Sequence, residues 1–349
     1  MNLPLNPATL SDDTRRPAAR ALALIAAVCV TLLAVGCTTN DATGRSQLLA
    51  FDRGEEVAIG EEAMPQLIAE YGGEVPDASL RTYVADVGYS MVPFTESDNP
   101  SLPWEFTLLD SDVINAFALP GGKVFMSRGL AEAMTNEAQL AGVLGHEIGH
   151  VTARHTSERV GHSMGVQVLA GIVGAVAGYS SSQIVAQAVP EIVGAGGQGY
   201  LLKYGRDQEL EADRLGMRYM VRAGYAPIGL KQTMELLAEA AGGGRQPELL
   251  STHPHPEARV KQANTIIARD YAETQNNPDY GTFESRFQSR FLNVVATLPP
   301  ARHRPGVSGP NGRMPIAAYA LAAHQPHQHH DAPVDFNDPS SWCAFCRER

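Results

Sequence analysis

The stretch His146-Glu147-Ile148-Gly149-His150 decides the fold, because it holds two histidines four residues apart with a glutamate beside the first. On an α-helix, residues four apart lie on one face, so both imidazoles can bind one metal ion. Two neutral ring nitrogens suit Zn²⁺, and a hydrolytic zinc site keeps a position open for water. Glu147 lies where a carboxylate can take a proton from metal-bound water. The five residues alone leave one alternative open, which is a helix with two unrelated surface histidines.

The composition is that of a globular protein with a substantial core. The 349 residues suffice for one large domain or two, and 44% of them are hydrophobic and 19% charged. The formal net charge of −11 is not offset by a basic stripe, which argues against a nucleic-acid-binding protein.

The N-terminus has the pattern of a secretory signal peptide. Arg15, Arg16 and Arg20 precede an apolar run over residues 21–35, which is shorter than the ~20 residues that span a bilayer comfortably. The run ends in Leu33-Ala34-Val35-Gly36-Cys37, which resembles a bacterial lipobox. We therefore predict that lipid is attached to Cys37; an uncleaved N-terminal anchor is the alternative.

Cysteine usage agrees with export of a domain without disulfides. Cys29 would leave with the signal peptide, so residues 38–298 contain no thiol. Cys343 and Cys346 remain in the C-terminal tail. They could form half of a metal site or a redox pair, and an incidental spacing is the alternative.

Changes of hydrophobic period predict helices around a small sheet. Alternating segments over 104–109, 114–119 and 123–126 predict three strands of an antiparallel sheet. Asn136 and Gln139 could cap the helix of the histidine motif, which we expect to run to about Arg159. The apolar stretch 164–178 is short and glycine-rich, and is either a buried or a membrane-facing helix. Further helices are expected over residues 51–71, 78–92, 207–223, 228–241 and 256–272.

A zinc site with two histidines needs a third protein ligand, commonly a carboxylate from another helix. In Glu209-Leu210-Glu211-Ala212-Asp213, the first and last residues share a helical face and Glu211 points elsewhere. Glu209 is the predicted ligand, and Asp213 can accept a hydrogen bond from a ligand imidazole and fix its orientation. A solvated acidic helix face is the alternative.

Two other histidines are weaker candidates for the metal. On a continuous helix, His155 lies roughly opposite His146, so we interpret it as structural. We expect His162 at the surface or between helices, and His255 at the surface.

Taken together, the histidine motif and the Glu209–Asp213 stretch resemble the zinc metallopeptidase family of the CAAX prenyl endopeptidases and the heat-shock protease HtpX. Within that family the layout is most similar to the BepA-like periplasmic lipoprotein proteases, although without their helical-repeat domain. The match spans about residues 43–270. Three further stretches support it: Thr43-Gly44-Arg45-Ser46-Gln47-Leu48, Asn115-Ala116-Phe117-Ala118-Leu119-Pro120-Gly121-Gly122 and Ser251-Thr252-His253-Pro254.

The resemblance implies an α+β fold, mainly α-helical and of the zincin (gluzincin) type, with a small antiparallel sheet beside the active-site helix. It also implies a zinc-dependent endopeptidase with one Zn²⁺ per chain. The implied roles are metal ligands for His146, His150 and Glu209, a general base for Glu147, support of a ligand for Asp213, and an approach to the active site for His253 and Arg259.

Two roles for His253 stay open at this point. A histidine or arginine near zinc, here His253 or Arg259, could stabilise the oxyanion of the tetrahedral intermediate. Alternatively, His253 could occupy the open zinc position and hold the enzyme latent.

The predicted strand with Asn115, Ala116, Phe117 and Ala118 can pair with an extended substrate by strand addition. Because such pairing uses the main chain, we expect unfolded or extended segments of many sequences as substrates. The resemblance implies misfolded or misassembled envelope proteins, and a location on the periplasmic side of the outer membrane through the lipid anchor.

These observations divide the chain into four parts and leave two rival functions. The parts are a lipoprotein-type signal peptide over 1–36, a linker over 37–50, the zinc metallopeptidase domain over 51–298, and a disordered His- and Pro-rich tail over 299–349. One rival is a latent, chaperone-like protein that binds clients around a mainly structural zinc. The other is an intramembrane protease that uses residues 164–178 as a span. The oligomeric state is not predicted.

Overall fold

The computed structural model describes residues 38–96, 102–169, 204–242, 247–254 and 256–302. By its internal contacts the chain divides into two units, Met1–Thr38 and Thr39–Arg349, and the fold below is that of the second. The strands are β1 (Thr38–Thr39), β2 (Ser46–Gln47), β3 (Glu105–Leu109), β4 (Ala116–Leu119) and β5 (Lys123–Ser127). The longer helices are α2 (Arg53–Glu70), α3 (Ala78–Met91), α5 (Glu137–Thr152), α6 (His155–Leu169), α8 (Arg206–Arg222), α9 (Ile228–Gly242) and α11 (Pro256–Asp270). The short helical segments are η2 (Val92–Phe94), α4 (Arg128–Glu132), α10 (Leu249–Thr252), η4 (Ala272–Thr274), α12 (Glu284–Phe287), η5 (Gln288–Leu292) and α13 (Asn293–Val295).

The three-stranded sheet is mixed, so the prediction of a purely antiparallel sheet is wrong in this detail. Its order is β3-β5-β4, with β5 antiparallel to β4 and parallel to β3. The chain reverses at each connection, so β3 and β5 run in the same direction. Because β5 lies between the other two strands, it meets β3 in parallel. The prediction of a mainly helical α+β fold is confirmed.

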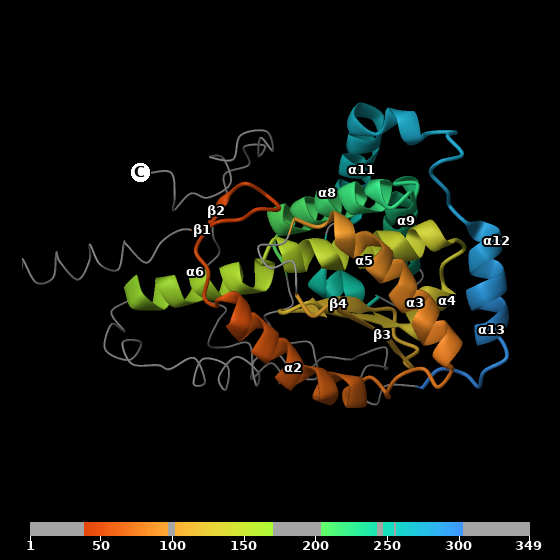
Figure 1. The fold of residues 1–349 in the computed structure, drawn as a ribbon, viewed down its shortest axis with the longest axis horizontal. Coiled ribbons are helices and arrows are strands. Elements are labelled where there is room, and N and C mark those ends of the chain that lie inside the picture. Colours follow the sequence, from red (N-terminus) through yellow and green to blue (C-terminus); the bar gives the residue numbers. More distant parts are fainter. Residues whose placement is uncertain (1–37, 97–101, 170–203, 243–246, 255, 303–349) are drawn as a thin grey trace, which may run out of the picture. The chain divides into compact units, whose positions relative to one another are not determined.

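Both faces of this sheet are buried, and each faces its own helices (Figure 1). Phe106, Val124 and Ala118 point into the large core formed with α3, α5 and α8. Phe117 and Phe125 point to the other side, where α2 covers them. Side chains of a strand alternate between faces, so this division follows from the alternation in the sequence. One face of the sheet thereby packs against α5.

Helix α5 is wholly buried and begins where its capping residue predicts. The Asn136 Oδ1 accepts a hydrogen bond from the Gln139 backbone amide at 3.0 Å, as expected of an N-cap. Every residue from Glu137 to Thr152 is buried. Polar groups in such a helix need partners within the protein, which is the setting of the histidine motif.

Glycines bring α5 and α8 into backbone contact. A Cβ on Gly216 would lie 2.8 Å from the His146 backbone nitrogen, and one on Gly149 would lie 2.8 Å from the Ala212 carbonyl oxygen. Only hydrogen fits between the helices at these positions. This close approach lets short side chains from α8 reach the histidines of α5.

We expect Gly216→Ala to destabilise the protein by about 1–3 kcal/mol and to weaken metal binding, because α8 must move away from α5. Thermal unfolding and zinc titration measure both effects. Gly54→Ala on α2 is the matched control, since its Cβ would meet only the Asp52 carboxylate at 3.3 Å. Equal stability and zinc affinity in the two variants would contradict the packing argument.

The helix of the histidine motif ends earlier than predicted. It stops at Thr152, and a second helix, α6, starts at His155 instead of continuing to Arg159. Arg154 has a φ of 56°, in the left-handed region that breaks a helix. The prediction that His155 lies opposite His146 is therefore wrong, because the break redirects the chain.

The segment predicted as a linker packs against the domain from Asn40 onward. The Asn40 Nδ2 donates to the Thr152 carbonyl at 2.9 Å, and the Gln47 Nε2 donates to the Ala153 carbonyl at 2.7 Å. A polar segment is expected to be exposed to solvent, but here the side chains donate hydrogen bonds to carbonyl groups at the C-terminal end of α5.

The described chain also continues past the predicted end of the domain at residue 298. The Arg302 backbone amide donates to the Asp110 carbonyl at 3.2 Å, and the Asp112 amide donates to the Arg302 carbonyl at 3.0 Å.

None of the described helices has the length and apolarity needed to cross a membrane. Outside the described residues lie the signal region 1–36, Cys37, His255, residues 170–178 of the apolar stretch, and the tail beyond residue 302 with Cys343 and Cys346.

Candidate metal centre

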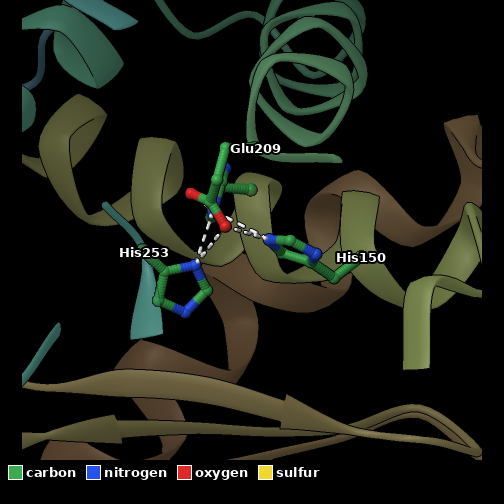
Figure 2. Close-up of side chains that lie close together, drawn as sticks. His150, Glu209 and His253 are labelled. Atoms are coloured by element: carbon green, nitrogen blue, oxygen red, sulfur yellow. Dashed lines mark hydrogen bonds and ion pairs between the residues drawn. The ribbon is translucent and has the colours of Figure 1, made fainter. Parts of the chain in front are cut away.

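Four buried side chains from three parts of the fold converge on one point. His146 and His150 come from α5, Glu209 from α8, and His253 from the residue that follows α10. One ligand atom from each lies within 4.8 Å of all the others. Figure 2 shows the His150 and His253 rings directed at the Glu209 carboxylate. The structure thus brings together the three predicted ligands and adds His253 to them.

Most of the distances between these atoms are close to those expected between ligands of one metal ion. The His146 and His150 Nε2 atoms are 3.0 Å apart, and the His253 Nδ1 lies 3.2 Å from the His146 Nε2. The Glu209 oxygens lie 3.5, 3.4 and 3.0 Å from the His146, His150 and His253 nitrogens respectively. Four ligands about 2.0–2.1 Å from a tetrahedral zinc ion lie roughly 3.3–3.4 Å apart. The donor set therefore fits one zinc ion.

Asp213 and Arg259 form a layer behind these ligands. The His146 Nδ1 lies 2.8 Å from the Asp213 Oδ1, so a neutral imidazole that donates there keeps Nε2 free for a metal. The Arg259 guanidinium contacts both Asp213 oxygens, at 2.7 and 2.6 Å, and the Glu209 Oε2 at 2.8 Å. All three guanidinium nitrogens thus contact carboxylates, namely those of Asp213 and of the predicted ligand Glu209.

Glu147 is buried beside the cluster without a hydrogen bond. Neither of its carboxylate oxygens has a hydrogen-bond partner within the described part of the chain, and its Oε1 lies 3.6 Å from the His253 Nε2. Burial raises the pKa of the Glu147 carboxyl, against the opposing charges of His253 and His146. A buried carboxylate without a hydrogen bond is costly, so this position suits a polar ligand in addition to the described side chains.

The ionisable groups of the cluster have strongly perturbed pKa values. Burial lowers the pKa of His150 well below its usual value, which favours the neutral ring. Burial would raise the pKa of Glu209, but the charges of His253 and Arg259 hold it well below its usual range. For His146, burial and Arg259 lower the pKa, but Asp213 and Glu209 outweigh them and raise it to about 9. Metal binding would therefore displace a proton from His146.

Two side chains next to His150 were not predicted to belong to the site. The Tyr204 ring stacks on the His150 ring with centroids 3.7 Å apart, and its backbone amide donates to the Thr252 carbonyl at 3.1 Å. His155 contacts the other nitrogen of the His150 ring, with 2.8 Å between the two Nδ1 atoms. No sequence pattern places Tyr204 in the site. A helix break before His155, had the sequence indicated one, would have made this histidine a candidate for the site.

The strand predicted to bind substrate forms an edge of the sheet and contacts the segment that carries His253. β4 pairs only with β5 among the described strands, and its side chains are buried. At its start, the Asn115 Nδ2 donates to the Glu248 Oε1 at 3.0 Å, and the Leu249 amide donates to the Ile114 carbonyl at 3.2 Å. The Tyr71 hydroxyl donates to the same Glu248 oxygen at 2.5 Å. The start of α10 is thus held by hydrogen bonds to the residues at the amino end of β4.

The remaining candidates lie away from the cluster. His162 is exposed, as expected for a surface position. Glu211 faces away from the metal ligands, as its place on the helix predicted, and contacts His155 and Arg45.

Comparisons with known proteins identify the family. The pattern of peptidase family M48 matches residues 78–267. The chain is 33% identical over 221 residues to the beta-barrel assembly-enhancing protease of Escherichia coli (strain K12), covering 60% of this chain and 43% of that protein. It is 30% identical over 228 residues to the mitochondrial metalloendopeptidase OMA1 of Schizosaccharomyces pombe, covering 64% of this chain and 65% of that protein.

The chain is also similar to a human protein, and it spans only part of the length of its bacterial relatives. The human mitochondrial metalloendopeptidase OMA1 is 28% identical over 240 residues, covering 64% of this chain and 45% of that protein. The chain spans less than half the length of the bacterial relatives, 43% of the Escherichia coli protein and 46% of the putative one from Vibrio cholerae. The family match confirms the family predicted from the motifs, together with its zincin-like fold. The matched residues make up more than half of the sequence, and the chain belongs to peptidase family M48.

Proposed function

We propose that this protein is a zinc-dependent endopeptidase. The observation that carries the proposal is the buried cluster of His146, His150, Glu209 and His253 atoms beside the Glu147 carboxylate, which accepts no hydrogen bond from the described residues. Two imidazoles and one carboxylate are a common ligand set of hydrolytic zinc. The names of the relatives, a protease and metalloendopeptidases, support the same activity.

When bound, zinc would polarise the scissile carbonyl and activate a water molecule. The protein supplies the proton transfer. A Glu147 oxygen takes a proton from the attacking water and passes it to the amide nitrogen that leaves as an amine. Burial raises the pKa of the Glu147 carboxyl, which makes its carboxylate a stronger base than an exposed one.

Asp213 and Arg259 are proposed to hold the ligands in place. Asp213 keeps the His146 proton on Nδ1, and Arg259 bridges Asp213 and Glu209. A bidentate guanidinium fixes both carboxylates in position and charge. We therefore assign Arg259 to positioning of the carboxylates rather than to contact with an oxyanion.

His253 is proposed to keep the enzyme latent. Its Nδ1 lies 3.0 Å from Glu209 and 3.2 Å from the His146 Nε2, where a fourth ligand would lie. A hydrolytic site needs this position for water or substrate. Release of His253 is then a condition for activity, and α10 is the element that must move.

The substrates are proposed to be unfolded or misassembled proteins of a bacterial cell envelope. Main-chain pairing with β4, at Asn115, Ala116, Phe117 and Ala118, would select extended conformation over sequence. The names of the bacterial relatives, which refer to beta-barrel assembly, support envelope clients. A lipid on Cys37 would hold the domain on the periplasmic side of the outer membrane.

Removing the metal tests the core of this proposal. We expect chelation to abolish cleavage of an unfolded reporter protein, and zinc to restore it. A metal present at 100 times its Kd stabilises the folded state by about 2.7 kcal/mol, so chelation should lower the Tm by roughly 5–10 °C. Reporter cleavage and differential scanning calorimetry measure the two effects. Full activity in a chelated sample with no residual zinc would exclude a metallopeptidase.

A further inference from the structure

A second buried polar network lies behind His150, and the proposed chemistry does not use it. It contains His155 at the start of α6, Glu211 on α8, Arg45 from the segment before β2, and Glu158 on α6. The exposed fraction of each side chain is 7% or less. Burying several charged groups together is costly unless each has a partner, so their arrangement needs an explanation.

The first contact of the network is to a proposed metal ligand. The His155 Nδ1 lies 2.8 Å from the Nδ1 of His150, the nitrogen that faces away from the metal position. The break at Arg154 makes this contact, because it returns the chain toward α5. The other proposed histidine ligand, His146, instead reaches the carboxylate of Asp213 directly. The two ligand histidines are therefore supported in different ways.

The second contact leads to a fixed carboxylate. The His155 Nε2 lies 2.9 Å from the Glu211 Oε2. Arg45 contacts that carboxylate through Nε at 3.0 and 3.1 Å, and it reaches the Glu158 Oε2 at 2.8 Å on its other side. One guanidinium thus joins two carboxylates, and Glu211 remains an acceptor for His155.

Only one placement of protons satisfies all of these contacts when the rings are neutral. Glu211 accepts, so the His155 Nε2 carries the proton and its Nδ1 has the lone pair. The His150 Nδ1 must then donate, which leaves the lone pair of its Nε2 for the metal. The reversed arrangement would place two lone pairs or two protons against each other at 2.8 Å.

We propose that His155, Glu211 and Arg45 are positioning residues that fix the tautomer and orientation of His150 for metal binding. The proposal rests on the metal site of the proposed function. It also gives the segment before α2 a role in the metal site, since Arg45 belongs to that segment. Partners of this kind, one shell outside the metal ligands, typically change metal affinity about 10–100-fold when they are removed.

The test is the zinc Kd of the full chain, measured by competition with a chromophoric chelator. We expect His155→Leu, which removes the acceptor for His150, to weaken zinc binding by about 10–100-fold. His155→Asn places an amide oxygen near the former Nδ1 and should restore most of the affinity. Arg45→Lys loses the bidentate contact with Glu211 and should fall between these two variants.

A matched control separates positioning from general stability. Arg128 is buried and paired with Asp110 at 3.3 Å, and none of its described contacts is to the metal cluster. Arg128→Lys should lower the Tm of the metal-free protein and leave the zinc Kd unchanged. His155→Leu and Arg45→Lys should raise the zinc Kd, whereas Arg128→Lys, which also lowers the Tm, should not.

The outcomes distinguish this inference from the proposed function. If the wild-type chain binds zinc and both His155 variants match its Kd within twofold, the positioning role is overturned while the metal site stands. If the wild-type chain binds no zinc, the proposed function fails and the positioning role with it. Should His155→Leu not fold, Arg45→Lys decides: a zinc Kd equal to that of the wild type would overturn the proposal.

Discussion

Glu147→Gln should strongly reduce peptide hydrolysis and leave the fold and metal binding intact. The glutamine has nearly the same shape, but its amide cannot take a proton from water. General acid–base catalysis typically contributes 10²–10⁴-fold, so we expect kcat to fall by about that factor. Zinc content should stay at one ion per chain, because Glu147 is not among the clustered ligand atoms. Reporter cleavage and metal analysis of the purified variant measure both quantities.

An exposed glutamate provides the control for this change. Glu61 on α2 is exposed, so Glu61→Gln makes the same chemical change away from the cluster and should keep wild-type kcat. Undiminished hydrolysis by Glu147→Gln would remove Glu147 from the role of general base. Loss of zinc from that variant would instead indicate that Glu147 helps to bind the metal.

The inactive variant also tests the proposed substrate class. Expressed in the cell envelope, Glu147→Gln should retain uncleaved clients that mass spectrometry can identify. Enrichment of misassembled envelope proteins over the Glu61→Gln control supports the proposal. Recovery of the same abundant proteins from both variants would contradict it. Unchanged biological activity of Glu147→Gln would favour the rival function, client binding without cleavage.

His253→Ala should raise hydrolysis rather than lower it. The wild-type His253 lies in the fourth ligand position, so its removal leaves three protein ligands and a free place for water. If the open state makes up roughly 1–10% of the wild-type protein, the gain in activity is about 10–100-fold. Initial rates at equal zinc occupancy measure this gain. Exposed His162 is the matched control, and His162→Ala should behave as wild type.

The opposite result has a clear meaning. A histidine that stabilises an oxyanion typically contributes 10²–10³-fold to kcat. A fall of that size in His253→Ala, at full zinc occupancy, would assign His253 to the transition state and end the latency proposal.

The central residues of the site could be predicted because their spacing is local. His146 and His150 share a helical face, as do Glu209 and Asp213, and one turn of helix fixes each pair whatever the tertiary structure. The sequence also predicts a general base at Glu147, because this residue lies beside a predicted ligand, and that role stays a prediction. Only the contact between the two helices is long-range, and small residues such as Gly216 permit it.

The features that were missed depend on long-range geometry. The sequence predicts a helix that continues past Thr152, because Arg154 carries no signal for a left-handed backbone, and the break at Arg154 gives His155 a position that the sequence does not predict. Arg45 was assigned to a linker because polar residues look alike whether water or a buried carboxylate satisfies them. The order of the strands was missed because alternation predicts strands but not which strand lies in the middle.

The attachment of α10 to the start of β4 has a consequence for how a latent enzyme could be switched on. Asn115 and Ile114 form hydrogen bonds with Glu248 and Leu249, so the strand proposed to bind substrate also holds α10, which carries His253 to the proposed metal position. If a client chain pairs along β4 and disturbs this attachment, each event weakens the other by the same free energy, because linkage is reciprocal. The client would then act as its own activator: its pairing would favour release of His253, and the free energy spent on that release would lower its apparent affinity.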